Sequence, residues 1–228
     1  MAQREALSQV RISVRNLVEF VMRSGDLDDR RMAGAKKEAM QAGSRLHRKI
    51  QRRMGSDYQA EVSLKHTVKE DSFELLIEGR ADGIITEPGG VTIDEIKCIY
   101  MDPGRLEEPD PVHMAQALCY GTIYAVHHDL EEIGIQLTYC NIETEEIRRF
   151  KEVKTREELE DWFKGLIHEY VKWARYLYHH RMRRQECLKT LQFPYAYREG
   201  QKELAACVYR SVAEGRNLYI QAPTGVGK

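Results

Sequence analysis

The sequence predicts a mixed α/β core in which helices flank a β-sheet, and two patterns lead to this expectation. Between residues 58 and 98 apolar side chains alternate with polar ones, which is the period-two pattern of strands. Before and after this run the apolar residues recur three and four positions apart, as on one face of a helix. The chain has 228 residues, of which 42% are hydrophobic, and this is enough to bury a full core.

The first expected elements are two helices. Residues 12–22 carry apolar side chains at helical spacing, and Gly25 ends this segment. A second helix is expected over residues 33–54, ending at Gly55, and its last turns are strongly basic. The basic side chains of these turns are Arg45, His47, Arg48, Lys49, Arg52 and Arg53.

Four strands are expected in the alternating run. Their ranges are 58–64, 73–77, 81–86 and 91–98. The polar segment Glu70-Asp71-Ser72 and the segment Glu87-Pro88-Gly89-Gly90 have the composition of reverse turns. The second of these turns brings the ends of the third and fourth strands close together.

The second half of the chain returns to helical spacing. A loop rich in proline precedes a helix over 112–127, and two further strands are expected over 135–142 and 146–153. A long amphipathic helix starts near Leu159 and ends in a basic cluster over 179–184.

Charge and cysteine content narrow the function classes. The formal net charge is −1, so any nucleic-acid-binding surface has to be a local patch. The five cysteines are scattered without a CxxC pair, so neither a zinc site nor a compact iron–sulfur ligand set is visible. Free thiols, no signal peptide and no apolar run of about 18 residues predict a cytoplasmic protein without a membrane segment.

Asp82, Glu95 and Lys97 form the most informative chemical pattern. Residues i and i+2 of a strand point to the same face, so Glu95 and Lys97 lie side by side, and the turn brings Asp82 close to them. Two carboxylates can hold a hard divalent cation, and an adjacent ammonium can orient a water or neutralise developing charge. This combination suits phosphodiester hydrolysis. Asp94 alternates to the opposite face and is expected to have a structural role.

With three further residues, this pattern resembles the PD-(D/E)xK nucleases of the RecB type, a group that includes the CRISPR-associated RecB-like exonucleases. The helical histidine of the family matches His47. Its trailing Q-x-x-x-Y motif matches Gln116 and Tyr120, which share one helix face. Ala81 stands where the family usually has proline before its first acid, at a tolerant position.

The resemblance spans about residues 10–185 and implies a restriction-endonuclease-like fold, with DNA as the substrate and a Mg²⁺- or Mn²⁺-dependent exonuclease activity. The implied metal ligands are His47, Asp82 and Glu95, together with a backbone carbonyl near Ile96. Lys97 would orient the attacking water or stabilise charge on the phosphate. Gln116 and Tyr120 would contact the DNA backbone near the scissile phosphate.

Several residues near the motif keep two interpretations. Arg80 is either an ion-pair partner or a phosphate contact, and His113 is either a site residue or a helix residue outside it. Gln116 and Tyr120 either contact DNA or simply pack. The basic ends of the long helices are either solvated faces or phosphate contacts.

Cysteine content separates this chain from the iron–sulfur members of the group. Those members add a C-terminal cysteine triplet, whereas this chain has only Cys187 in that region. No iron–sulfur cluster is therefore expected within these residues.

The last 40 residues, 189–228, predict the beginning of a second domain. A helix is expected over 201–212 and a short strand over 217–221. The segment Ala222-Pro223-Thr224-Gly225-Val226-Gly227-Lys228 then follows the strand, as a phosphate-binding loop does. With Phe193-Pro194-Tyr195 and Gln201 upstream, this region resembles the start of a superfamily 2 helicase of the DinG/XPD type.

The helicase resemblance implies an ATP site in the full-length protein. Its residues would be Gln201, Gly225, Gly227 and Lys228. The helix that should follow Lys228 is missing, so no ATPase activity is expected from these residues. The expectation is a nuclease domain over 1–188 in front of a DNA helicase. The alternatives are a catalytically inactive module that loads DNA into the helicase, and a stand-alone nucleotide-binding protein.

Overall fold

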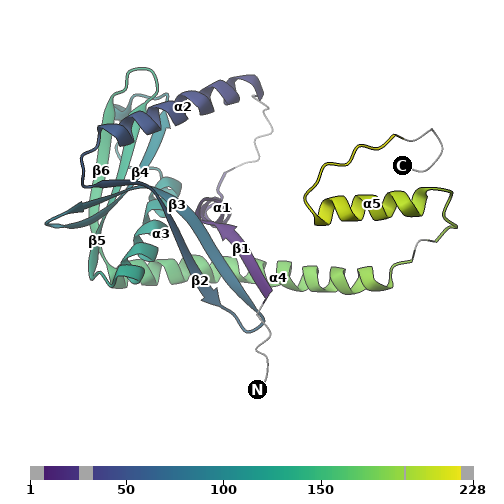
Figure 1. Cartoon of the computed structure of the whole chain (residues 1–228). Coiled ribbons are helices and arrows are strands. Elements are labelled where there is room, and N and C mark those ends of the chain that lie inside the picture. Colours follow the sequence, from purple (N-terminus) through teal and green to yellow (C-terminus); the bar gives the residue numbers. More distant parts are fainter. Residues whose placement is uncertain (1–7, 26–32, 193, 222–228) are drawn as a thin grey trace. The chain divides into compact units, whose positions relative to one another are not determined.

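The computed structural model describes residues 8–25, 33–192 and 194–221 (Figure 1). The chain divides into two compact units, Met1–His180 and Arg181–Lys228. The first unit contains the sheet and every residue of the predicted nuclease site. The second contains α5 (Gln201–Ala213).

Six strands form one mixed sheet in the first unit. They are β1 (Ser8–Ser13), β2 (Tyr58–Lys69), β3 (Phe73–Glu87), β4 (Gly90–Ile99), β5 (Glu132–Asn141) and β6 (Ile147–Thr155). The order is β1-β3-β4-β5-β6, and β2 also pairs with β3. β1 runs parallel to β3 and β4 runs parallel to β5, whereas the other pairs are antiparallel. The predicted α/β fold with a mixed sheet is confirmed.

The long strand β3 has one edge that two other strands share. β2 pairs with β3 over residues 74–85. On the other edge, β1 pairs with residues 73–78 and β4 with residues 83–87. Residues 79–82 of β3 pair with neither β1 nor β4, so the sheet has a gap between these two strands.

Helices cover both faces of the sheet around this gap (Figure 1). They are α1 (Val14–Val21), α2 (Ala33–Arg53), α3 (Pro111–His128) and α4 (Arg156–Thr190), with a short 3₁₀ helix at Pro103–Arg105. A large hydrophobic cluster joins the sheet to α1, α3 and α4, and it includes Ile93 of β4. A small cluster joins α2 to the other face, and it includes Leu46, Ile50 and Ile96. Since Ile93 and Ile96 point to opposite faces, the two clusters lie on opposite sides of β4.

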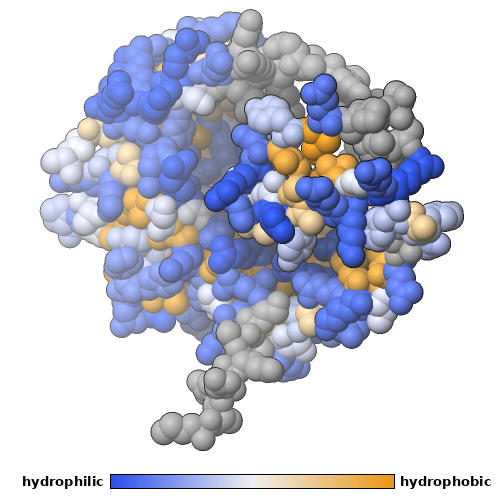
Figure 2. Space-filling model, turned by 45° about the vertical axis from the view of Figure 1, so that its right-hand side comes forward, coloured by the Kyte–Doolittle hydropathy of each residue, from blue (hydrophilic) through white to orange (hydrophobic). Residues whose placement is uncertain are grey.

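The face shown in Figure 2 is mainly hydrophilic, as a chain with 31% charged residues leads one to expect. In the view of Figure 2, hydrophobic side chains gather only in small, separate patches. None of the described helices has the combination of length and apolar character that a membrane-spanning helix needs.

The structure differs from the expected elements at three places. The segment at 12–22 is not helical from its start, because Ser8–Ser13 forms β1 and the Ser13 hydroxyl then caps α1 by accepting from the Asn16 N–H at 3.1 Å. The strands expected at 73–77 and 81–86 are one strand, since pairing with β2 continues through the polar residues between them. The strand expected at 217–221 is wrong: these residues form no ladder with any described strand, and a single strand has no partner for its backbone groups.

Gly83 is a position where the sheet tolerates no side chain. The ring of Tyr58 lies over Gly83, so a Cβ there would overlap the Tyr58 hydroxyl. This hydroxyl donates to Asp94 at 3.3 Å. We expect Gly83→Ala to lower the free energy of unfolding by about 1–3 kcal/mol, the usual cost of overpacking, in urea denaturation. Gly89→Ala is the matched control, since a Cβ at Gly89 meets nothing within 4 Å; equal losses in both variants would contradict the packing at Gly83.

Candidate active site

The predicted site residues meet at the gap between β1 and β4. Pairing of β3 with β4 ends at Gly83 and Asp94, and beyond this point the two strands separate. The Asp82 side chain lies in the opening, where its Oδ2 accepts from the Ile96 N–H at 2.8 Å. Side chains from elements on both faces of the sheet can therefore meet in this gap.

His47 reaches the gap from α2. The Leu46 and Ile50 side chains anchor α2 on the sheet, and this orients His47 toward β3. His47 Nε2 lies 3.1 Å from Asp82 Oδ2. Burial lowers the pKa of His47, but the hydrogen bond and charge of Asp82, with the charge of Glu61, outweigh it, and the net pKa is raised.

Glu95, Lys97 and Gln116 approach from the α3 side. Lys97 Nζ donates to Glu95 Oε1 at 2.9 Å and to Gln116 Oε1 at 2.5 Å. α3 is fixed at its start by Asp110, whose carboxylate accepts from the Val112 N–H at 2.8 Å. The predicted side-by-side arrangement of Glu95 and Lys97 is thus present, and Gln116 is bound to the lysine.

Glu95 is the most perturbed acid of the site. Its side chain is 7% exposed, and its Oε2 is buried without a hydrogen-bond partner. Burial, followed by the charge of Asp82, raises the pKa of Glu95 to about 7, although Lys97 acts in the opposite direction. A buried, unpartnered carboxylate oxygen next to a second carboxylate is an arrangement that a cation stabilises.

All six predicted site residues line one open cleft of about 1060 Å³. They are His47, Asp82, Glu95, Lys97, Gln116 and Tyr120. Tyr120 packs against Gly79 of the gap, where any Cβ would come within 2.7 Å of its hydroxyl. Gln116 and Tyr120 are 4% and 6% exposed, so both pack as well as line the cleft. A contact of either residue with DNA stays a prediction.

The structure adds two residues that the sequence patterns did not single out, Glu61 and Gln51, and joins them to Arg80. Glu61 of β2, Gln51 of α2 and Arg80 of β3 form a connected group beside His47. Arg80 Nε lies 2.6 Å from Glu61 Oε2, so Arg80 is an ion-pair partner. The spacing of His47 and Gln51, four residues apart on one helix face, is the only sequence signal that could have identified this group.

Two residues next to the motif have other contacts. Asp94 points away from the cleft, as expected, and accepts from Thr138 at 2.6 Å and from Gln136 at 2.9 Å. His113 lines the cleft, and its Nδ1 lies 3.0 Å from the Tyr139 hydroxyl. Burial, followed by the charge of Lys97, lowers the pKa of His113.

The basic end of α2 is partly neutralised. Lys49 and Arg53 form ion pairs with Glu145, which lies between β5 and β6. Arg48 also lines the cleft, and its Nε donates to the Ser44 carbonyl at 3.1 Å. Of the basic residues at this end of α2, His47 and Arg48 line the cleft, and a contact of Arg48 with phosphate stays a prediction.

The structure does not test the predicted nucleotide-binding residues. Gly225, Gly227 and Lys228 lie outside the described residues. Gln201 is the first residue of α5, and its Oε1 accepts from the Arg198 N–H at 2.8 Å. The ATP site and the helicase resemblance therefore stay predictions, as does the domain boundary at residue 188.

The donor set of the cleft fits a hard divalent cation. Carboxylate oxygens of Asp82 and Glu95 and a ring nitrogen of His47 are ligand types that Mg²⁺ and Mn²⁺ accept. The unpartnered Glu95 Oε2 is the observation that supports this fit. His47, Asp82 and Glu61 also offer ligand atoms within 4.8 Å of one another.

Comparison with known proteins shows similarity to solved structures only. No protein-family model and no curated protein matches this sequence. The crystal structure of SSO0001 matches with 19% identity over 73% of this chain and 78% of that chain, with a TM-score of 0.44. An alkaline exonuclease from Laribacter hongkongensis matches with 14% identity over 76% and 94%, with a TM-score of 0.39. A phage-related exonuclease from Haemophilus somnus 129PT matches with 15% identity over 74% and 82%, with a TM-score of 0.37. Because these sequence identities and TM-scores are low, the function has to be inferred from the residues of this chain.

Proposed function

We propose that the first unit is a divalent-cation-dependent nuclease that hydrolyses phosphodiester bonds of DNA. The observation that supports this best is the convergence of Asp82, Glu95 and Lys97 in one cleft, with Glu95 Oε2 buried and unpartnered. A buried carboxylate oxygen without a partner is costly, and this favours a site that binds a cation over a purely structural cluster.

His47, Asp82 and Glu95 would hold Mg²⁺ or Mn²⁺. When bound, the cation supplies Lewis-acid stabilisation of charge on the phosphate and lowers the pKa of a water ligand. Asp82 is preoriented for this role because the Ile96 N–H holds one of its oxygens. Placement of these three ligands on two strands and a helix gives the site a rigid support.

Lys97 would act on the reacting atoms directly. Its ammonium group has three N–H bonds, of which Glu95 and Gln116 accept two. The third is available to orient the attacking water or to stabilise negative charge on the phosphate. Gln116 then positions Lys97 as well as contacting DNA. Tyr120 would contact the DNA backbone across the gap.

We also propose an exonuclease mode and a helicase domain after residue 188, both of which rest on the sequence resemblances. The cleft is open at the surface and large enough for a strand end. In the second unit, α5 begins at Gln201, the last residue of the segment that resembles the adenine-reading region of the helicase family. ATP would be a ligand of the full-length protein only.

One assay tests the nuclease proposal. End-labelled linear DNA and covalently closed circular DNA of the same sequence are incubated with Mn²⁺, with Mg²⁺ or with EDTA. We expect the linear DNA to be degraded with cation only and the circular DNA to persist. Cleavage of the circle would replace the exonuclease mode by an endonuclease mode. DNA binding without cleavage under both cations would favour the inactive loading module.

A further inference from the structure

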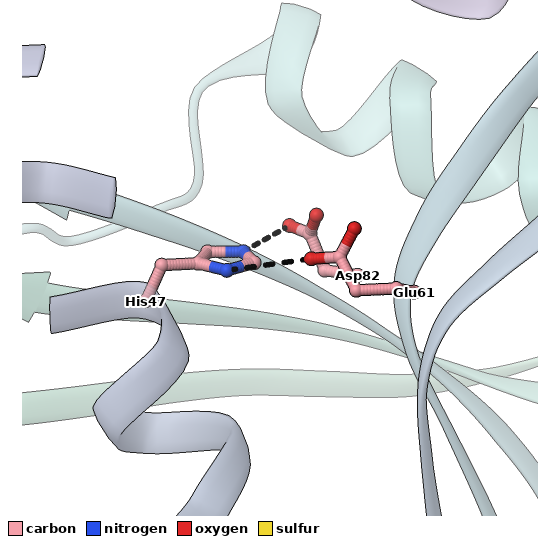
Figure 3. Close-up of side chains that lie close together, drawn as sticks. All are labelled: His47, Glu61 and Asp82. Atoms are coloured by element: carbon pink, nitrogen blue, oxygen red, sulfur yellow. Dashed lines mark ion pairs between the residues drawn. The ribbon is translucent and has the colours of Figure 1, made fainter. Parts of the chain in front are cut away.

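Glu61 lies beside the proposed cation ligands without belonging to the motif that predicted them. It lies in the first half of β2, and the pairs Ala60–Gly83 and Val62–Ala81 on either side place it opposite Asp82 of β3. Its side chain is 38% exposed and lines the cleft. Figure 3 shows the carboxylates of Glu61 and Asp82 next to each other, each facing one nitrogen of the His47 ring.

The backbone of Glu61 is strained for a strand residue. Its φ is +58°, and the regular pairing of β2 with β3 skips this residue, from Ala60–Gly83 to Val62–Ala81. Only two other non-glycine residues of the described chain have a positive φ. These are Asp129, at the end of α3, and Glu145, between β5 and β6, where such backbones are common. A left-handed residue inside a strand is costly and often accompanies a functional site.

The Glu61 carboxylate is held on both oxygens. Arg80 Nε lies 2.6 Å from Oε2, and Gln51 Nε2 donates to Oε1 at 3.0 Å. Gln51 Nε2 also donates to the Asp82 carbonyl at 2.9 Å, the backbone group opposite the break in the ladder. Because both oxygens are occupied, the carboxylate is fixed where it stands and is poorly placed to move onto a cation.

The fixed carboxylate faces the second nitrogen of His47. Glu61 Oε1 lies 3.8 Å from His47 Nδ1, while His47 Nε2 points at Asp82. A rotation of the ring that moves Nδ1 by about 1 Å would close this distance to a hydrogen bond. Histidine ligands of metals usually donate their other N–H to a carboxylate, which fixes the tautomer and the ring orientation.

We propose that Glu61 is a positioning residue: it accepts a hydrogen bond from the Nδ1–H of His47 and so leaves the Nε2 lone pair for the cation that Asp82 also binds. This inference rests on the proposed function. Glu61 would not touch the cation or DNA itself. The strained backbone is what places its carboxylate beside His47.

The test measures Mn²⁺ affinity of the whole chain by isothermal titration calorimetry, without DNA. We expect Glu61→Gln and Glu61→Gly to weaken Mn²⁺ binding by about 10- to 100-fold. Glu145→Gly is the matched control, because it removes another positive-φ glutamate with two ion pairs, away from the cleft. Unchanged affinity in both Glu61 variants would overturn the inference but leave the proposed function standing. No Mn²⁺ binding by the wild type would overturn both.

A double-mutant cycle separates positioning from direct ligation. If Glu61 acts through His47, Glu61→Gln should cause little further loss in a His47→Gln background. Independent losses that multiply would mean that Glu61 is itself a ligand, and would overturn the inference.

Imidazole ¹⁵N shifts of the Mg²⁺-bound wild type give a second readout that needs no stable variant. We expect His47 to be protonated at Nδ1; protonation at Nε2 instead would contradict the proposal.

Discussion

Lys97→Ala should lower the rate of DNA cleavage by at least about 10²- to 10³-fold, the usual loss when one stabilising donor is removed from an active site. Lys97 is the only cationic side chain hydrogen-bonded to Glu95 in the part of the chain that the structure describes. It is also bound to Gln116, so its removal frees two groups of the cleft. The loss should appear in the rate constant at saturating DNA, measured with Mn²⁺ in a single-turnover assay.

The fold and DNA binding should survive this substitution. Without Lys97, Glu95 can remain buried by keeping its proton, since its pKa is already raised to about 7 and would rise further. Circular dichroism and binding of labelled DNA in Ca²⁺ check this. Lys164→Ala is the matched control, because Lys164 forms only exposed ion pairs on α4. Unchanged cleavage by Lys97→Ala would refute the catalytic assignment.

Glu95→Gln should abolish cation-dependent cleavage and, at the same time, make the cation-free protein more stable at neutral pH. The folded protein binds the Glu95 proton more tightly than the unfolded chain does, because the pKa rises from 4.5 to about 7 on folding. Between these two values the stability contributed by this proton is lost as the pH rises. The free energy of unfolding should therefore fall by up to about 1.4 kcal/mol per pH unit from this group.

Urea denaturation in EDTA at pH 5, 6, 7 and 8 measures this slope. The wild type should lose stability relative to Glu95→Gln as the pH rises, and saturating Mn²⁺ should restore the wild type only. Glu132→Gln is a suitable control, since Glu132 is exposed at the start of β5. Parallel pH profiles for the wild type and Glu95→Gln would show that Glu95 is not the perturbed acid.

Local sequence was sufficient where the chemistry depends on strand alternation. Glu95 and Lys97 share a face because they are two residues apart, and Asp94 lies on the other face for the same reason. The turn at Pro88-Gly89 places β4 against the end of β3, which brings Asp82 near both residues. These positions depend only on residues close together in the sequence. The predicted arrangement of Asp82, Glu95 and Lys97 therefore agrees with the structure.

Packing decided the elements that depend on distant partners. β1 has only six residues, and it is a strand because residues 73–78 of β3 pair with it. β3 continues through its polar middle because β2 supplies the hydrogen bonds. The segment at 217–221 has strand-like composition but pairs with no described strand, and so it is not one.

The sequence by itself determined that this chain carries two acids and a lysine in an arrangement suited to phosphodiester chemistry, because that arrangement follows from the two-residue period of strands. Only the tertiary structure decided where they meet, since the gap in the sheet exists only when β1 and β4 pair with different parts of β3. It also placed the Glu61 carboxylate beside His47. The positive φ of Glu61, and its contacts with Gln51 and Arg80, arise from the packing of α2 and β3, which no local pattern encodes.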